Sequence, residues 1–220
     1  MHIRKKPWAR PELAACPYFI ADPEPHKGKW QELFKTKKAL HVELGCGKGV
    51  STAEMVYHHQ DTNFVVLDLI SDVLGSTRRN IAKRFSKEPI ENVIITRYNV
   101  DYIEKIFSEE DEVSRIYISF CNPWSERKKH FKRRLTHSRQ LQQYRKFLAE
   151  NGEIWFKTDN VPLFDDSLVY FKENGFSIEY QTRNLQESGF TPNYISEHEA
   201  KFMSQGIPIN FVIAKKQKMD

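Results

Sequence analysis

Short apolar runs of β-forming residues alternate with longer segments of helical spacing from residue 39 onward. The apolar runs predict seven strands, at residues 39–44, 63–68, 92–97, 115–120, 153–157, 176–182 and 207–214. The segments between them predict helices at residues 49–59, 71–86, 101–108, 136–149, 161–174 and 196–204. This alternation is typical of α/β architecture. We therefore expect a doubly wound, mostly parallel sheet with helices on both faces.

The fourth predicted helix has the clearest pattern, because Leu141, Tyr144 and Phe147 share one face. Thr136 stands where it could cap the start of this helix. Asn151, followed by a glycine, could end it in the left-handed conformation.

Residues 1–36 are rich in proline and aromatic residues and have no clear periodicity. We expect an N-terminal arm there, packed on a single domain at residues 37–220, because no repeat or Gly/Ser linker divides the rest of the chain. In doubly wound sheets, ligands bind outside the carboxyl ends of the strands. The residues just after each strand are therefore the candidates for function.

The first strand leads into ELGCGKG, where Glu43 is followed by Gly45, Gly47 and Gly49. Alternate glycines allow a tight turn and let a ligand approach the backbone, although a purely structural turn is the alternative. Asp68 ends the second strand, 23 residues after Gly45, near the ~20-residue spacing of ribose-binding acids in nucleotide folds. Its alternative role is to cap the next helix. Together these residues favour a cofactor that contains a nucleoside.

Polar residues also follow the third, fourth and fifth predicted strands. Asn99 could bind an adenine edge or simply form a turn, and Asp101 could take the same role. Asn122-Pro123-Trp124 stands where a substrate would meet the cofactor, or is a turn with a core tryptophan. Asp159 or Asn160 could bind a base or cap the helix that follows.

The positive charge is concentrated in one segment. The chain has 34 Lys+Arg and 29 Asp+Glu, a net charge of +5, and residues 121–135 alone hold six basic residues and one acidic residue. Clustered bases displace counterions from a nucleic-acid backbone, whereas a solvated loop is the alternative. The candidate phosphate contacts are Arg127, Lys128, Lys129, His130, Lys132, Arg133 and Arg134.

The composition, at 40% hydrophobic and 29% charged, is that of an ordinary globular protein. No apolar run approaches the ~20 residues that span a bilayer, and the basic start has no apolar segment behind it. We expect a cytoplasmic protein with no membrane contact. The three cysteines form no CxxC pair and the histidines have no ligand spacing, so no metal is predicted.

Taken together, these motifs resemble class I S-adenosylmethionine-dependent methyltransferases, and more narrowly the bacterial tRNA (guanine-N7-)-methyltransferase family. The resemblance covers nearly the whole chain and rests on RKKPWA, ELGCGKG, the CNPW corner with its RKKHFKRRL tail, NGEIWFKTDN and SEHEAKF. The glycine loop is shared across the superfamily, whereas the corner with its tail and FKTDN are specific to the family. The resemblance implies a Rossmann-like class I methyltransferase fold with a seven-stranded sheet.

The resemblance also implies the cofactor and how it is held. Glu43 and the glycine loop would bind the methionine part of S-adenosylmethionine, whose product is S-adenosylhomocysteine, and Asp68 would bind the ribose. Asn99 would lie beside the adenine. Asn122 would stand at the reacting centre, as the catalytic residue and a cofactor contact.

For the substrate, the resemblance implies tRNA, with the target at guanine-46 of the variable loop. The basic segment would bind tRNA phosphates, and Asp159 and the segment from Ser196 to Glu199 would hold the guanine. We expect a monomer or a homodimer.

The chain departs from the family pattern at several of these positions. The family has Asp-Pro-Trp-Pro at the corner, so its catalytic aspartate corresponds to Asn122; it also has an acid at Asn99 and Thr-x-Tyr-Glu at residues 196–199. Guanine N7 carries a lone pair and no proton, so alignment matters more than a general base, and we predict an active but slower enzyme. The first alternative is a catalytically weakened or inactive tRNA-binding paralogue. The second is an amino-directed nucleic-acid methyltransferase that uses Asn122-Pro123-Trp124.

Overall fold

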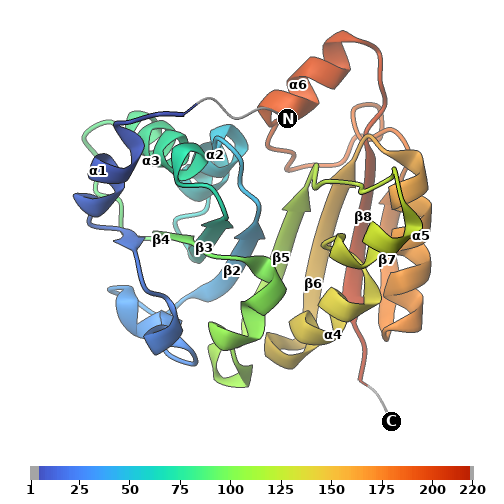
Figure 1. Cartoon of the computed structure of the whole chain (residues 1–220), viewed down its shortest axis with the longest axis horizontal. Helices are drawn as coiled ribbons and strands as arrows, with labels where there is room; N and C mark the ends of the chain where they lie inside the picture. The colour runs from blue at the N-terminus through green and yellow to red at the C-terminus, as the bar shows by residue number, and fades with distance from the viewer. Residues whose placement is uncertain (1–4, 219–220) are drawn as a thin grey trace.

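One sheet of eight strands organises the computed structural model, which describes residues 5–218 (Figure 1). The strand order is β1-β4-β3-β2-β5-β6-β8-β7; β8 runs antiparallel to β6 and β7, and the other pairs are parallel. All seven predicted strands are present. The additional strand is β1, a two-residue edge strand that pairs with β4. The bounds are β1 (Phe19–Ile20), β2 (Ala39–Leu44), β3 (Thr62–Asp68), β4 (Val93–Arg97), β5 (Val113–Ser119), β6 (Leu148–Thr158), β7 (Phe176–Thr182) and β8 (Asn210–Lys216).

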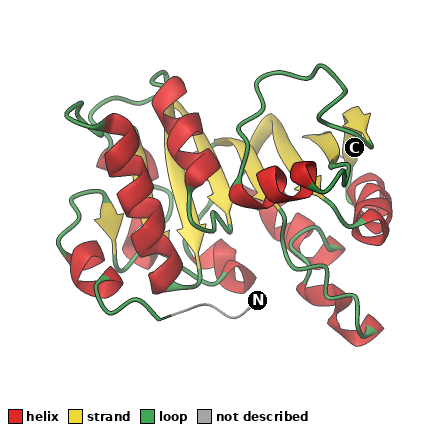
Figure 2. Cartoon of the chain, turned by 90° about the horizontal axis from the view of Figure 1, so that it is seen from above, coloured by secondary structure: helices red, strands yellow, loops and turns green. Residues whose placement is uncertain are grey.

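Helices lie on both faces of the sheet, as Figure 2 shows from above. The α-helices are α1 (Ala9–Ala14), α2 (Val50–His58), α3 (Ser71–Phe85), α4 (Ser138–Phe147), α5 (Val161–Glu173) and α6 (Glu197–Ser204). The 3-10 helices are η1 (Glu24–His26), η2 (Trp30–Leu33), η3 (Val100–Lys105), η4 (Glu109–Asp111) and η5 (Lys128–Arg133). The helix predicted at residues 101–108 is therefore a 3-10 helix, and α1 was not predicted.

Alternation along each strand produces two cores. In β2, Leu40, Val42 and Leu44 pack on the face covered by α4, α5 and η3. The opposite face of β3 and β4 is covered by α1, α2 and α3. A third cluster lies on that second face over β6 and β8, where Phe190 packs against Phe211 and Phe202 packs against the same cluster. Polar side chains on this second face, at the carboxyl ends of the strands, can therefore meet.

Both predicted ends of α4 are wrong. Its N-cap is His137, whose side chain accepts from the Arg139 backbone N–H, because the Thr136 hydroxyl is buried against Ser167, with 2.6 Å between the oxygens. The helix ends at Phe147, since the chain then enters β6 and pairs with β5. Asn151 does have a positive φ of 63°, but it lies within β6, where the register shifts.

The N-terminal arm contributes to the first core through Trp30, which is fully buried. Its indole N–H donates to the Ile106 carbonyl at 2.7 Å, and its ring stacks on Phe107. Asp111 accepts from the backbone N–H groups of Gly28 and Trp30. Residues 1–4 of the arm, and residues 219–220 at the other end of the predicted domain, lie outside the described residues.

Candidate functional site

The glycine loop joins β2 to α2. Two of its glycines have free space beside the Cα atom, and the third is packed against a neighbouring helix. Gly45, Gly47 and Gly49 all have positive φ, at 77°, 58° and 71°. A Cβ at either of the first two would meet no atom within 4 Å, whereas at Gly49 it would lie 2.4 Å from the Thr77 Cγ2. Only Gly49 is thus required by packing between α2 and α3. The backbone at Gly45 and Gly47 stays accessible to a ligand.

Asp68 lies beside this loop, as the sequence predicted. Its carboxylate accepts from the Gly47 N–H at 3.2 Å and from the Ile70 N–H at 3.0 Å. Burial raises the pKa of Asp68, while these backbone hydrogen bonds oppose the shift. The capping alternative receives no support, because α3 begins after Ile70 without a side-chain cap.

Glu43 is 4% exposed at the end of β2, and its carboxylate accepts from the Thr52 hydroxyl at 2.6 Å. Burial raises its pKa to about 7, while the Thr52 hydrogen bond and the charge of Lys157 act in the opposite direction. The structure therefore brings Glu43, the glycine loop and Asp68 together at one edge of the sheet. Sequence reasoning did not identify Thr52.

Lys157 and Glu199 form a buried ion pair on the same face, with 3.2 Å between the Nζ and Oε2 atoms. Glu199 is fully buried in α6, and its other oxygen accepts from the Asn193 side chain at 2.7 Å. Ser196 caps α6 by accepting from the Glu199 N–H. Of the residues predicted to hold a guanine, Ser196 and Glu199 are therefore engaged in local contacts. Lys157 and Asn193 were missed, although Lys157 stands within the FKTDN motif.

The corner after β5 is held by its own backbone and by Arg134. The Asn122 side-chain oxygen accepts from the Trp124 N–H at 2.9 Å, and Asn122 is exposed. Trp124 itself has a positive φ of 50°. Arg134, which is 1% exposed, donates to the Pro123 carbonyl at 2.7 Å and pairs with Asp166.

Arg134 is therefore a correction to the predicted phosphate contacts. Its guanidinium stacks on the Phe131 ring and has no exposed surface to offer a phosphate. It fastens the corner to α5 instead, because Asp166 lies in that helix. A run of basic residues in a sequence does not show which of them is buried in the fold.

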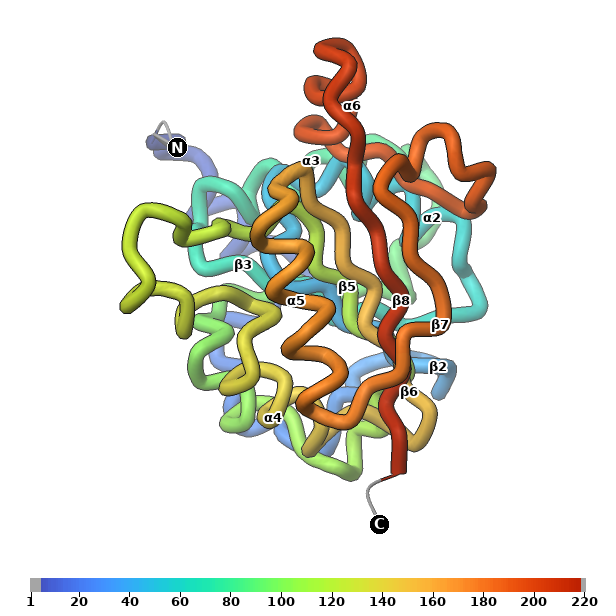
Figure 3. Tube along the Cα trace, turned by 90° about the vertical axis from the view of Figure 1, so that its right-hand side faces the viewer, coloured from blue at the N-terminus to red at the C-terminus, as the bar shows by residue number. Residues whose placement is uncertain are grey.

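The other basic residues of the segment lie on or beside η5, and all except the half-buried His130 are exposed. Within residues 5–218, none of the five exposed bases pairs with a carboxylate: Arg127, Lys128, Lys129, Lys132 and Arg133. The loop after β5, yellow-green in Figure 3, projects away from the sheet. The segment is therefore an exposed patch of positive charge beside the Asn122 corner.

The remaining predicted residues are Asn99 and Asp159. The Asn99 side chain caps η3 by accepting from the Asp101 N–H, which agrees with its turn alternative. Asp101 is bound to α4 through Arg139 and Gln140. At the end of β6, Asn160 is the cap of α5, so Asp159 is the half-buried carboxylate left at that strand end.

Neither a metal centre nor a membrane span is found among the described residues. Across that part of the chain, no three His, Cys, Asp or Glu side chains lie close enough to hold a metal ion. None of the helices described is long and apolar enough to cross a membrane.

Comparison with known proteins gives close relatives over the full chain. A family model described as "Putative methyltransferase" matches residues 37–212. A tRNA (guanine-N(7)-)-methyltransferase of Clostridium botulinum (strain Alaska E43 / Type E3) is 50% identical over 219 residues, covering 99% of this chain and 100% of the relative. The protein of the same description from Ruminiclostridium cellulolyticum is 46% identical, covering 100% of this chain and 94% of the relative.

Solved structures agree at the level of the fold. The 16S rRNA methyltransferase KamB matches with a TM-score of 0.63 at 10% identity, covering 86% of this chain and 93% of that one. A structure described as an antibiotic related methyltransferase matches with a TM-score of 0.61 at 15% identity, over 92% and 98% of the two chains. The sheet order described above is thus that of a Rossmann-like class I methyltransferase fold.

Proposed function

The chain belongs to the family of tRNA (guanine-N(7)-)-methyltransferases, and we propose that it transfers the methyl group of S-adenosylmethionine to N7 of guanine-46 in the tRNA variable loop. The observation that carries this proposal is the arrangement at the carboxyl ends of the strands. Glu43 and Asp68 flank an open glycine loop there, and the Asn122 corner leads into the exposed basic segment.

The residues present fit S-adenosylmethionine. Two carboxylates border the loop, and the backbone at Gly45 and Gly47 has free space beside it. Asp68 would accept from the ribose hydroxyls and Glu43 would face the methionine part, with Asn99 beside the adenine. When bound, the cofactor supplies an activated methyl group on a sulfonium.

Methyl transfer to guanine N7 does not require a general base. Guanine N7 has a lone pair in the ring plane and no proton to remove, so the site must mainly align the purine. Asn122 offers a dipole where a carboxylate would favour the positive charge that develops on the ring. The reaction is therefore catalysed, but more slowly than with an aspartate.

The five exposed bases would bind tRNA phosphates, with His130 beside them. Asp159 has the most accessible carboxylate of the residues assigned to the guanine, because Glu199 is fully buried and paired. A tRNA substrate also fits a cytoplasmic protein. Whether it acts as a monomer or a homodimer stays a prediction.

The direct test is incubation with methyl-labelled S-adenosylmethionine and tRNA that lacks N7 methylation. Label should appear at N7 of guanine-46, and calorimetry should show binding of S-adenosylhomocysteine. Cofactor binding without label in the tRNA would reject the activity.

The exposed amide of Asn122 favours one second candidate, a tRNA-binding paralogue without turnover. That protein would bind tRNA in a salt-sensitive way and transfer no methyl group. An amino-directed enzyme is less well supported, because the Asn122 oxygen that would accept from a base amine already accepts from Trp124. Label on an exocyclic amine would revive it.

A further inference from the structure

The Lys157 ammonium occupies a buried position between the cofactor side and the substrate side of the proposed site. Its side chain is 14% exposed at the end of β6. It donates to the carboxylate of Glu199, to the side-chain oxygen of Asn193 and, at 3.4 Å, to the carbonyl of Tyr194. Its charge also acts on Glu43, two strands away across β5. A single cation thus binds the buried carboxylate of Glu199 directly and also favours the charged form of Glu43 on another strand.

Such a group is costly to leave unpaired. Burial lowers the pKa of Lys157, and the charge of Glu199 opposes that shift. A buried ammonium keeps its charge only when carboxylates and carbonyls replace the lost water. The positions of Asn193, Tyr194 and Glu199 are therefore tied to Lys157.

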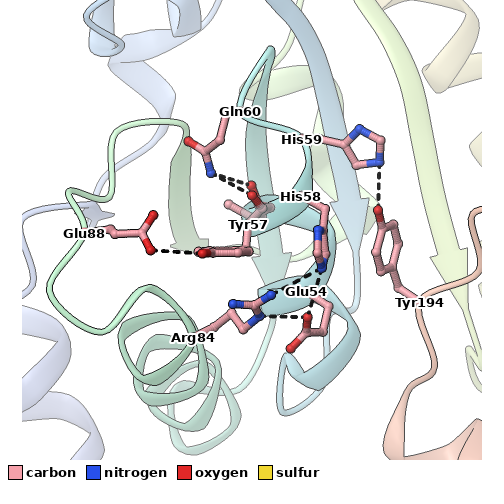
Figure 4. Close-up of polar contacts among 9 residues, drawn as sticks. Glu54, Tyr57, His58, His59, Gln60, Arg84, Glu88 and Tyr194 are labelled. Atoms are coloured by element: carbon pink, nitrogen blue, oxygen red, sulfur yellow. Dashed lines mark hydrogen bonds and ion pairs between the residues drawn. The ribbon is translucent and has the colours of Figure 1, made fainter.

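The tied segment, residues 193–204, is the one that carries Ser196 and α6. It is anchored a second time through Tyr194, whose ring stacks on His58 and whose hydroxyl lies 3.1 Å from the His59 Nε2 (Figure 4). In Figure 1, α6 lies beyond the carboxyl ends of β5 and β6. At its start, Glu197 pairs with Lys48 of the glycine loop at 2.8 Å. The segment therefore closes over the same edge of the sheet as the cofactor loop.

We propose that Lys157 is a positioning residue for methyl transfer: by holding Glu199, Asn193 and the Tyr194 carbonyl, it fixes residues 193–204 relative to the cofactor end at Glu43. This inference rests on the proposed function. In this role Lys157 acts through the segment that it holds. Misplacing a substrate-facing element by about 1 Å can cost ~10²-fold in rate.

The test compares Lys157→Met with a matched control, Lys146→Met, which removes an exposed lysine that pairs with Glu104 in the opposite layer. Three quantities are measured for each full-length protein: affinity for S-adenosylhomocysteine by calorimetry, amide hydrogen exchange of residues 193–204, and the single-turnover rate at saturating tRNA and S-adenosylmethionine. Lys157→Met should exchange faster in that segment and lose ~10²-fold in rate. Its cofactor affinity should fall far less than its rate, because the Thr52 hydroxyl, which acts on Glu43 more strongly than the Lys157 charge does, still holds that carboxylate. The control should match the wild type in all three.

A double-mutant cycle with Glu199→Gln adds a signature that a general loss of stability would not give. If the two residues act as one unit, the double variant should lose much less rate than the two single losses combined. Glu199→Gln also supplies the exchange measurement if Lys157→Met does not fold.

Three results would overturn the inference. The first is an unchanged rate in folded Lys157→Met, and the second is unchanged exchange in residues 193–204. The third is a loss of cofactor affinity as large as the loss of rate, which would place the effect in the cofactor pocket. A wild-type protein that transfers no methyl group at all would instead reject the proposed function, and the exchange comparison would then still decide whether Lys157 holds the segment.

Discussion

At the scale of single residues, the Asn122 amide is the feature with the clearest consequence for catalysis. Its oxygen accepts from the Trp124 N–H, and an aspartate of the same shape would keep that hydrogen bond. Asn122→Asp should therefore preserve the corner and add a negative charge near the purine. We expect the single-turnover methylation rate to rise by ~10-fold or more.

The same measurement distinguishes the two candidate functions. A rise from a measurable parent rate fits an active, slower enzyme, whereas a rate that appears only in the variant fits the inactive paralogue. An unchanged or lower rate in the folded variant would contradict the electrostatic role given to this position.

Glu43 predicts a pH dependence, because burial raises its pKa to about 7, above its usual range. Between about pH 4.5 and pH 7 the unfolded chain has lost this proton and the folded protein keeps it, so stability falls as pH rises. Denaturant unfolding of the wild type, compared with Glu43→Gln, should show a decrease on the order of 3 kcal/mol across this range and a constant difference above it. A wild-type stability that rose with pH relative to that of Glu43→Gln would contradict the assignment.

At the scale of elements, different glycines of the loop serve packing and ligand binding: Gly49 packs against α3, whereas Gly47 has free space beside it. Gly49→Ala places a Cβ 2.4 Å from Thr77 and should cost several kcal/mol, since backbone must also move. Gly47→Ala has free space around it, so only the left-handed backbone penalty of about 1–2 kcal/mol applies. Urea unfolding of both variants measures the difference.

Calorimetry completes this comparison. Gly47→Ala should weaken S-adenosylhomocysteine binding out of proportion to its small effect on stability, because its methyl group enters the space beside the loop. Equal unfolding free energies for the two variants would show that the loop relaxes around Thr77.

The main strands and helices were predictable because their apolar periodicity is local. The elements that were missed lack such a signal: α1 and β1 lie in a proline-rich arm, and β1 exists only because residues 19 and 20 pair with β4. The capping error at Thr136 has the same origin, since its hydroxyl is taken by Ser167, 31 residues away. Local patterns cannot show such long-range competition for a polar group.

In the candidate site, too, the residues at strand ends were predictable, whereas long-range contacts were not. Strand-end reasoning located Glu43, the glycine loop and Asp68, which the fold does bring together. It could not show that Arg134 is buried, nor that Lys157 joins Glu199 across 42 residues of sequence. The functional roles of these residues stay predictions.

At the scale of the whole molecule, the net charge of +5 equals that of residues 121–135, where five of the six bases are exposed. Replacing Lys128 and Lys129 by alanine should weaken tRNA binding and reduce the slope of log affinity against log salt by about 0.7–0.9 for each phosphate that is no longer neutralised. Filter binding over a range of salt concentrations measures this slope. Alanine at the exposed Lys35 and Lys172 is the control, and an equal effect there would show that overall charge matters rather than the patch.

The antiparallel strand β8 has a consequence for synthesis on the ribosome. It lies between β6 and β7 and is the pairing partner of β7, yet it is made after both. While residues 210–216 are still inside the exit tunnel, β6 has no partner along the edge that β8 will occupy, and β7 has no neighbour in the sheet. The nascent chain must therefore keep an apolar strand edge from pairing with other chains until nearly all of this sequence has been translated.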